Sequence, residues 1–369
     1  MTMTLTKLQA HDRVHNFSAG PSALPLPVLE QIQKDMLHLP GAGASVLEIS
    51  HRSKDFDKIL GEAESDLRTL LGISGSHKIF FLQGGASHQF AMLPMNLARG
   101  KRAGYLLTGE WGKKAYQEAQ AVAEAEVLWS GASEKYCGLP PAGAYKTSPE
   151  LAYVHYTSNE SIQGVQFHHI PEAGGAPLVC DMSSDFLSRP IKTEQYGVIY
   201  AGAQKNVGPA GLTVVVMRED LVSRSAEDIA PIFKYATHEG SRYNTPPVFA
   251  IYAAGLTFKW LLNTYGNLKE VSAAGKDKAE TLYGVIDASG GFYKPHAKKD
   301  CRSHMNVTWT LKDEKLEDAF LKEAEAHHLS GLKGHRSVGG MRASLYNAVP
   351  KESVSALAAF MTDFMKRNS

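Results

Sequence analysis

The sequence predicts an α/β fold in which helices flank a mostly parallel β-sheet. Short, almost wholly apolar runs recur between residues 79 and 217, and longer stretches with helical periodicity lie between some of them. Strands that helices cover on both faces have this continuous apolar character, because neither face meets water. The apolar runs are 79–82, 104–107, 152–156, 177–180, 198–201 and 213–217.

Helical patterns fill several of the intervals between these runs. Residues 113–125 carry one, and the Thr-Pro-Pro segment that begins at Thr245 predicts a long helix to about residue 262, with Thr245 as its N-cap. Further along, residues 305–311 alternate between polar and apolar side chains as a strand does. Apolar side chains recur at helical spacing over 354–365, which predicts a closing helix.

A chain of 369 residues is longer than one hydrophobic core normally serves, so more than one domain is expected. Past residue 265 the composition shifts toward Lys, Glu and Ala, and strand-like runs become fewer. We therefore expect an N-terminal tail over residues 1–15, a large domain over 16–267 and a smaller C-terminal α/β domain over 268–369.

Charge and composition limit the classes of partner. The formal net charge is only +1, so no broad basic surface is available to collect nucleic acid or an anionic membrane. No run approaches the ~20 apolar residues of a membrane span, and the N-terminus lacks the apolar core of a secretory signal. Cys137, Cys180 and Cys301 show no paired spacing, which favours a reducing compartment. We expect a cytoplasmic protein that binds neither nucleic acid nor membrane.

The stretch from Tyr200 to Gly211 carries the clearest chemical signal. An apolar run ends in small residues, and Lys205 follows in a turn rich in glycine and proline rather than on a polar helix. Glycines let the backbone bend and approach a bulky group closely. A desolvated lysine amine can lose its proton and form a Schiff base with a carbonyl compound. The motif alone also fits an ordinary loop lysine, so its meaning depends on its neighbours.

Three further motifs follow predicted strands. Asp181 comes directly after 177–180, and a carboxylate there could keep the ring nitrogen of a pyridine cofactor protonated. The Gln-Gly-Gly-Ala-Ser loop at 83–87 precedes a helix, where exposed N–H groups would bind a phosphate. Trp111 follows 104–107 and could stack on a planar ring. Each has a plainer alternative: a turn aspartate, a tight turn and a core tryptophan.

The four features are more informative together, because each follows a predicted strand. In open α/β sheets, ligands bind beyond the carboxyl ends of the strands, so these groups are expected to meet at one edge. A lysine, a carboxylate, a phosphate-binding turn and a stacking ring are the groups that pyridoxal phosphate requires. We expect Lys205 and Asp181 to be catalytic. No metal site is expected, because His168 and His169 have no cysteine or carboxylate nearby to complete one.

Seven short motifs combine small, polar and basic residues from residue 16 almost to the end of the chain. They are Asn16-Phe-Ser-Ala-Gly-Pro21, Glu48-Ile-Ser-His-Arg-Ser53, Gln83-Gly-Gly-Ala-Ser87, Asn159-Glu-Ser-Ile162, Ala203-Gln-Lys-Asn206, Asn244-Thr-Pro-Pro247 and Gly339-Gly-Met-Arg-Ala-Ser344. This set resembles the phosphoserine aminotransferases, within the class V, fold-type I pyridoxal-phosphate enzymes. The resemblance implies a pyridoxal 5'-phosphate cofactor and a homodimer whose active sites lie at the subunit interface.

The resemblance also implies roles at the cofactor ring. Lys205 would form the Schiff base, Asp181 would bind the pyridine nitrogen and Trp111 would stack on the ring. Ser161 would donate to the phenolic oxygen of the cofactor; the family often has threonine there, and serine keeps the hydroxyl.

A second set of roles concerns the cofactor phosphate. The backbone amides of Ala86 and Ser87, with Gln204, would bind it, and Asn244 and Thr245 would reach it from the other subunit. Some family members carry Gly-Arg in place of Ala86-Ser87, which leaves no side-chain charge for this phosphate here.

Basic residues provide the expected substrate contacts. The resemblance implies that Arg342 binds the α-carboxylate, and arginine suits this role because it pairs with carboxylates through two parallel hydrogen bonds. His335 and Arg336, with His51 and Arg52 of the neighbouring subunit, would bind the substrate phosphate or the side-chain carboxylate of glutamate. Each could instead be a surface ion-pair partner.

The implied reaction exchanges O-phosphoserine and 2-oxoglutarate with 3-phosphohydroxypyruvate and glutamate, in serine biosynthesis. A phosphorylated hydroxythreonine in pyridoxine biosynthesis is a related candidate substrate. Two alternatives stay open. A desulfurase or an aminotransferase for another small amino acid would share the fold, and Cys301 could serve the former. The other alternative is a cofactor-binding regulator without catalysis, and the presence of Lys205 and the substrate arginines argues against it.

Overall fold

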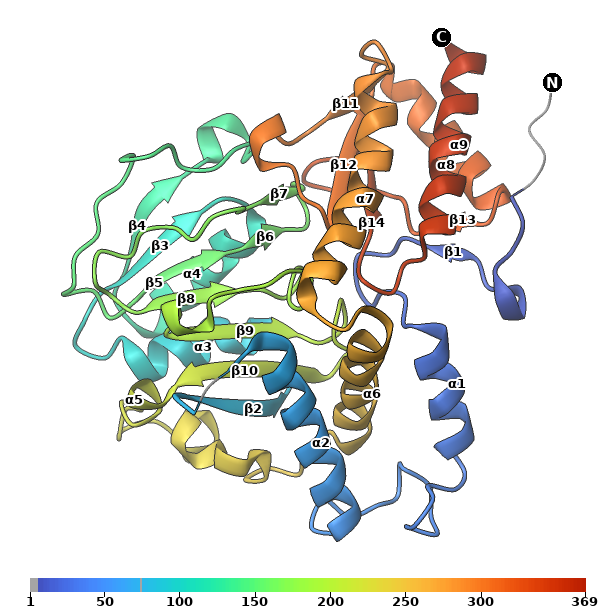
Figure 1. Cartoon of the computed structure of the whole chain (residues 1–369). Helices are drawn as coiled ribbons and strands as arrows, with labels where there is room; N and C mark the ends of the chain where they lie inside the picture. The colour runs from blue at the N-terminus through green and yellow to red at the C-terminus, as the bar shows by residue number, and fades with distance from the viewer. Residues whose placement is uncertain (1–5, 74) are drawn as a thin grey trace.

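The computed structural model describes residues 6–73 and 75–369, and its centre is a seven-stranded sheet (Figure 1). The strand order is β2-β10-β9-β8-β5-β3-β4. The strands from β9 to β4 run parallel, whereas β10 is antiparallel to both of its neighbours. Their bounds are β2 His77–Gln83, β3 Ala103–Leu107, β4 Ala125–Ser130, β5 Val154–Thr157, β8 Leu178–Asp181, β9 Val198–Gly202 and β10 Leu212–Arg218. The predicted mostly parallel sheet is confirmed.

Each of the six apolar runs forms a strand of this sheet, but β4 was not predicted. Its side chains are only partly buried, and it lies at the edge of the sheet. An edge strand that water reaches has no continuous apolar run, so its sequence does not carry the signal of a strand covered on both faces.

Helices cover the sheet on both faces. Buried side chains of α3 (Ala86–Leu97) and α4 (Glu110–Val122) pack on one face with Phe80, Tyr105 and Val215. Those of α2 (Lys54–Leu71) and α6 (Val248–Tyr265) pack on the other face with Phe81 and Val214. Successive residues of one strand therefore enter opposite cores, as the alternation of a β-strand requires.

Helix α6 begins later than the sequence suggested. Pro247 occupies the N-cap position and no side chain caps the helix, so the prediction of Thr245 as N-cap was wrong. A residue that precedes proline is disfavoured in the helical conformation, and both Thr245 and Pro246 precede one. The two prolines therefore delay the first helical residue to Val248.

The C-terminal elements form a second core beside the large sheet (Figure 1). A three-stranded antiparallel sheet packs with three helices: β11 Tyr293–Pro295, β12 Asn306–Leu311, β14 Met341–Ser344, α7 Leu268–Asp287, α8 Glu317–Ala326 and α9 Lys351–Asn368. Strand β1 (His15–Asn16) pairs with β13 (Leu329–Ser330), and Phe17 joins this core. The division into domains after residue 267 stays a prediction. The structure adds that residues 15–17 pack with the C-terminal elements.

Smaller elements complete the chain. They are α1 Leu26–Asp35, α5 Glu219–Val222 and the two-stranded sheet of β6 Asn159–Glu160 with β7 Val165–Gln166. Within the described ranges, no helix combines the length and apolar character that crossing a membrane requires.

Candidate active site

A pocket of about 270 Å³ lies where β8 and β9 end and where α3 and α4 begin. The carboxyl ends of parallel strands and the N-termini of the following helices meet at this edge of the sheet. The pocket is lined by Ala19, Gly20, Gly85, Ala86, Ser87, Trp111, Ser161, Ile162, Asp181, Ser183, Gln204, Lys205, His335 and Arg342. The four motifs that the sequence singled out therefore meet in one place.

Asp181 is the last residue of β8 and is 4% exposed. Its Oδ1 accepts hydrogen bonds from the backbone N–H and the hydroxyl of Ser183, at 2.9 and 2.6 Å. Among the residues that the structure describes, none donates to Oδ2. Burial raises the pKa of Asp181, and the charge of Lys205 opposes this shift. A cation placed against Oδ2 would keep the carboxylate ionised.

Lys205 follows β9 and extends across the pocket. Its Nζ lies 5.3 Å from the centroid of the Trp111 ring. The N-terminal segment holds its backbone: the hydroxyl of Ser22 donates to the carbonyl of Lys205 at 2.6 Å, and Gly20 packs on the same turn. A Cβ at Gly20 would lie 3.5 Å from Cγ of Lys205, and the positive φ of 145° there also favours glycine.

Trp111 is fixed at both its backbone and its ring. Its indole Nε1–H donates to the Ser161 hydroxyl at 3.0 Å, and the Ser161 carbonyl accepts from Nη1 of Arg342 at 3.1 Å. The backbone N–H groups of Trp111 and Gly112 donate to the two carboxylate oxygens of Glu160, at 3.0 and 2.8 Å. The tryptophan, the serine hydroxyl and the arginine thus share one chain of contacts.

The N-terminus of α3 forms the opposite end of the pocket. Helix α3 begins at Ala86, so the backbone N–H groups of Ala86 and Ser87 come too early to bond to a carbonyl of the helix, whereas that of His88 donates to the carbonyl of Gly85. The helix dipole and these donors make an anion site. Gly84 has a φ of +100°, and a Cβ there would lie 2.3 Å from Nδ1 of His88, so the turn requires glycine. Gln204 faces the same end of the pocket.

The expected substrate residues fall into two groups. Arg342, on β14, and His335 line the pocket, whereas Arg336 is exposed beside His335. Burial lowers the pKa of the Arg342 guanidinium, which an anionic partner would offset. His51 and Arg52, just before α2, do not line this pocket.

Asn244 and Thr245 also lie outside the pocket in this chain. Both are exposed, and Asn244 donates to the side-chain oxygen of Gln83. The side-chain amide of Gln83 in turn donates to the carbonyl of Thr245. This places the two residues near the C-terminal end of β2, on the outer side of the loop that leads into α3.

Sequence reasoning gave no role to Glu160, Ser183 or the segment from Ala19 to Ser22. The Asn16–Pro21 and Asn159–Ile162 motifs contain or adjoin most of these residues, so the motifs were a usable signal. Ser183 left no such signal, because its two hydrogen bonds to Asp181 depend on the fold of the turn after β8.

The structure gives no support to a catalytic cysteine. Cys301 is 1% exposed and lies outside the pocket lining, with its thiol bonded to the carbonyls of Cys137 and Lys298. Burial raises the pKa of Cys301 to about 12, which disfavours the reactive thiolate. The desulfurase alternative therefore loses its candidate nucleophile.

Comparison with known proteins identifies the class. The family model for class V aminotransferases matches residues 14–357, so the chain belongs to the class V aminotransferases.

Within this class, the chain is similar to several phosphoserine aminotransferases. A phosphoserine aminotransferase from Chromobacterium violaceum is 50% identical over 96% of this chain and 99% of its own. The solved phosphoserine aminotransferase from Bacillus circulans subsp. alkalophilus is 46% identical, with a TM-score of 0.94 over 97% of this chain and 100% of its own. A PLP-bound phosphoserine aminotransferase from Trichomonas vaginalis is 39% identical, with a TM-score of 0.89 over 95% of this chain and 99% of its own.

Proposed function

We propose that the chain is a pyridoxal-phosphate-dependent aminotransferase that exchanges O-phospho-L-serine and 2-oxoglutarate with 3-phosphohydroxypyruvate and L-glutamate. One observation carries the proposal: the amine of Lys205 and the buried carboxylate of Asp181 lie in one pocket with the N-terminus of α3. The activity named for relatives that are 46–50% identical over nearly the whole chain supports this choice of substrates.

The residues present fit the cofactor. Asp181 would bind the ring nitrogen through Oδ2, Trp111 would cover the ring and Ser161 would donate to the phenolic oxygen. Ala86 and Ser87, at the start of α3, and Gln204 would hold the phosphate. When bound, pyridoxal phosphate supplies a carbonyl carbon for amines and a ring that withdraws electrons from the substrate Cα. The acceptor capacity left on Oδ2 and the unpaired donors of α3 are the observations that support this fit.

Lys205 performs the proton transfers in the proposed mechanism. Its amine is the group that would hold the cofactor in the pocket when no substrate is bound. With substrate bound, the free amine would take the proton from the substrate Cα as a general base and would then give up that proton as a general acid. Its position between Trp111 and the carboxylate keeps this amine inside the pocket.

Arg342 orients the substrate in this proposal. It would bind the α-carboxylate that both amino donors carry, through a pair of charge-assisted hydrogen bonds. His335 and Arg336 would face the phosphate or the side-chain carboxylate, together with His51 and Arg52 of a second subunit. Phosphorylated hydroxythreonine shares both charged ends with phosphoserine, so it remains a candidate second substrate.

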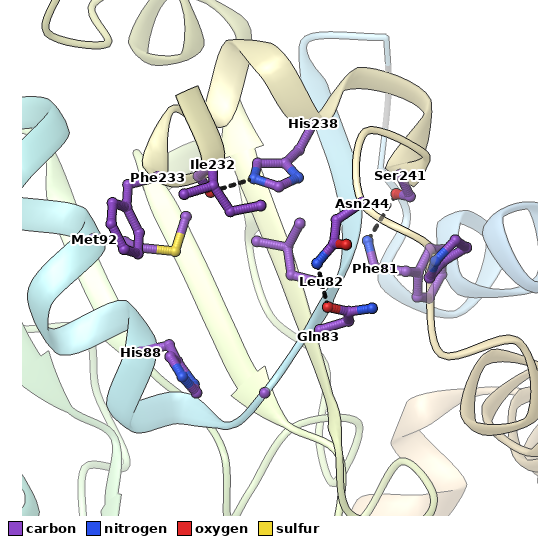
Figure 2. A pocket seen from close by; sticks show the side chains of 12 residues that line it. Phe81, Leu82, Gln83, His88, Met92, Ile232, Phe233, His238, Ser241 and Asn244 are labelled. Atoms are coloured by element: carbon purple, nitrogen blue, oxygen red, sulfur yellow. Dashed lines mark hydrogen bonds between the residues drawn. The ribbon is translucent and has the colours of Figure 1, made fainter. Parts of the chain in front are cut away.

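We propose a homodimer, supported by the surface around Asn244. A second pocket of about 380 Å³ lies next to the cofactor pocket, with Gln83, His88, Phe233 and Asn244 in its lining (Figure 2). Ile232 and Phe233 are 37% and 39% exposed and both line this pocket, and adjoining exposed apolar side chains are typical of an interaction surface. A partner placed here would bring its own Asn244 and Thr245 toward the cofactor phosphate.

Charge and cysteine usage support a location for the enzyme. We propose a cytoplasmic enzyme that binds small molecules and neither nucleic acid nor membrane. The net charge of +1 and three free cysteines support this assignment.

The test is a coupled assay on the purified protein. The rate at which glutamate forms from 2-oxoglutarate should be high with phosphoserine as amino donor. It should be at least about tenfold lower with alanine or cysteine, because only phosphoserine carries the second anionic group. Equal rates with alanine would refute the proposed substrate, and no transamination with any donor would favour a cofactor-binding protein without catalysis.

A further inference from the structure

Two neighbouring lysines on α4 have different surroundings. Nζ of Lys113 lies 3.9 Å from the Glu110 carboxylate. Lys114 forms no ion pair with any carboxylate in residues 6–73 and 75–369, and its Nζ lies 4.7 Å from the centroid of the Trp111 ring. An ammonium over an indole is held by the ring without losing its charge. Lys114 therefore retains its capacity to bind an anion.

The positive charge of Lys114 acts on His335, which lines the pocket. The pKa of His335 is lowered mainly by burial, and then by the positive charges of Arg342, Arg336 and Lys114. The one acid that opposes this effect is Glu110, which is already near Lys113. Arg342, Arg336 and Lys114 therefore all lie close enough to His335 for their positive charges to act on it.

These cations lie on the side of the pocket that His335 lines. Arg342 contacts the carbonyl of Ser161 and lines the pocket, whereas Lys114 is exposed. In the proposed function, a substrate with its α-carboxylate on Arg342 and its amino group at Lys205 would direct its other charged group toward His335. That group is a phosphate monoester in phosphoserine, with a charge near −2, and a single carboxylate in glutamate.

We propose that Lys114 binds the distal anionic group of the substrate and favours a phosphate monoester over a carboxylate. This inference rests on the proposed function. The ammonium group carries three donors on a flexible stem, which suits a tetrahedral anion with several acceptor oxygens. The Trp111 ring keeps that stem beside the pocket, so the ring would contact the cofactor and also position the lysine.

The test compares Lys114→Met with the matched variant Lys113→Met. Methionine keeps an unbranched apolar stem against Trp111 and removes the charge together with the three N–H donors. For Lys114→Met we expect KM for phosphoserine to rise about tenfold and KM for glutamate about threefold or less, since a charge-assisted hydrogen bond to a dianion is the stronger one. Lys113→Met should leave both values within about twofold of wild type, because exposed ion pairs contribute little.

Competitive inhibition by inorganic phosphate gives a second measurement. Its inhibition constant should rise about tenfold in Lys114→Met, and Lys114→Arg should restore most of the affinity. Equal increases in both KM values would show that Lys114 only supports Trp111, and unchanged values would also overturn the inference. If the wild-type enzyme does not use phosphoserine, the proposed function fails on that result alone, and phosphate inhibition of any other transamination still tests Lys114.

Discussion

At the scale of single residues, the pairing of Asp181 with Ser183 decides which carboxylate oxygen is available. Two donors from Ser183 fix Oδ1, so Oδ2 remains for a ligand. Burial raises the pKa of Asp181, and both a nearby cation and the two hydrogen bonds from Ser183 favour its charged form. A protonated ring nitrogen is such a cation, and the charge of Lys205 is another when no ligand is present.

Lys205→Ala should remove the visible absorbance of the lysine-bound cofactor and lower kcat by at least about a thousandfold, because Lys205 is the one lysine among the described residues that line the pocket. Absorbance spectra with and without phosphoserine, together with the coupled assay, measure both effects. Lys113→Ala is the control for a lysine lost from the same region. Turnover within tenfold of wild type would contradict the role of Lys205.

The residues found from sequence share one property. Lys205, Asp181 and Trp111 each follow an apolar run, so the end of a strand marks them. Glu160 and Ser183 act through hydrogen bonds to the backbone or to another side chain, and their partners are set by the tertiary fold. Residue type and spacing carry no such information, so these two residues required coordinates.

At the scale of elements, the start of helix α4 depends on a residue from another part of the chain. Its N-cap is Gly109, which has no side chain to accept a hydrogen bond. Glu160 supplies both acceptors instead and satisfies two of the unpaired N–H groups of the first turn. A Cβ at Gly109 would lie 2.4 Å from the Glu160 carboxyl carbon, so glycine leaves the space that this contact needs.

Glu160→Gln should weaken this cap and change the pH dependence of stability. Burial, with the charge of Asp181, raises the pKa of Glu160 to about 7, although the N–H groups of Gly112 and Trp111 lower it. A folded-state pKa above the unfolded value means that the folded protein binds the extra proton. The contribution is therefore complete below the ordinary pKa of 4.5 and is lost as pH rises toward 7.

The wild-type protein should lose up to about 3 kcal/mol from this group between pH 4.5 and 7, and Glu160→Gln should lose none of it. Chemical unfolding at several pH values measures the difference between the two slopes. Glu64→Gln, at a partly exposed carboxylate, is the control. Parallel slopes for wild type and Glu160→Gln would show that Glu160 is already ionised at low pH.

The elements themselves were largely predictable. Buried strands such as β9 and β10 have apolar runs that water on either face would interrupt, so the sequence located them within about two residues. The edge strand β4 and the first residue of α6 depend on exposure and on proline sterics rather than on apolar periodicity. These are two of the places where the sequence-based assignment differed from the structure.

At the scale of the whole molecule, a buried polar network joins the C-terminal elements to the large sheet. The Asn159 side-chain amide donates to Oδ1 of Asn306 at 2.8 Å, and the Ser303 hydroxyl donates to Oδ1 of Asn159 at 2.6 Å. The backbone N–H of Asn347 donates to Oδ1 of Asn206, the residue after Lys205, at 2.9 Å. The network therefore sets the position of β14, and with it Arg342, relative to Lys205.

Asn306→Ala should lower the free energy of unfolding by about 2–4 kcal/mol, because it leaves buried partners on Asn159, Ser344 and Tyr346 unsatisfied. KM should rise for phosphoserine and glutamate alike, since both depend on Arg342. Urea unfolding and steady-state kinetics measure these effects, and Asn368→Ala, at the exposed end of α9, is the control. A loss of stability without any change in KM would mean that the network does not position Arg342.

The last prediction tests the proposed homodimer. It concerns residues that lie outside the pocket of their own chain. His51, Arg52, Asn244 and Thr245 lie outside the pocket that Lys205 and Arg342 line. If Arg52 serves the partner's site, a mixed dimer of Lys205→Ala and Arg52→Ala chains contains one site with both residues intact. Random exchange of inactive variants should then restore about one quarter of the wild-type activity.

The same mixing experiment with Lys205→Ala and Arg342→Ala chains is the matched control. Both residues belong to one chain's pocket, so every site in that mixed dimer lacks at least one of them and activity should not return. Activity is measured after exchange at low protein concentration and compared with each variant alone. Absence of recovery in the Arg52 mixture, with exchange demonstrated by a tagged chain, would place Arg52 outside the partner's active site.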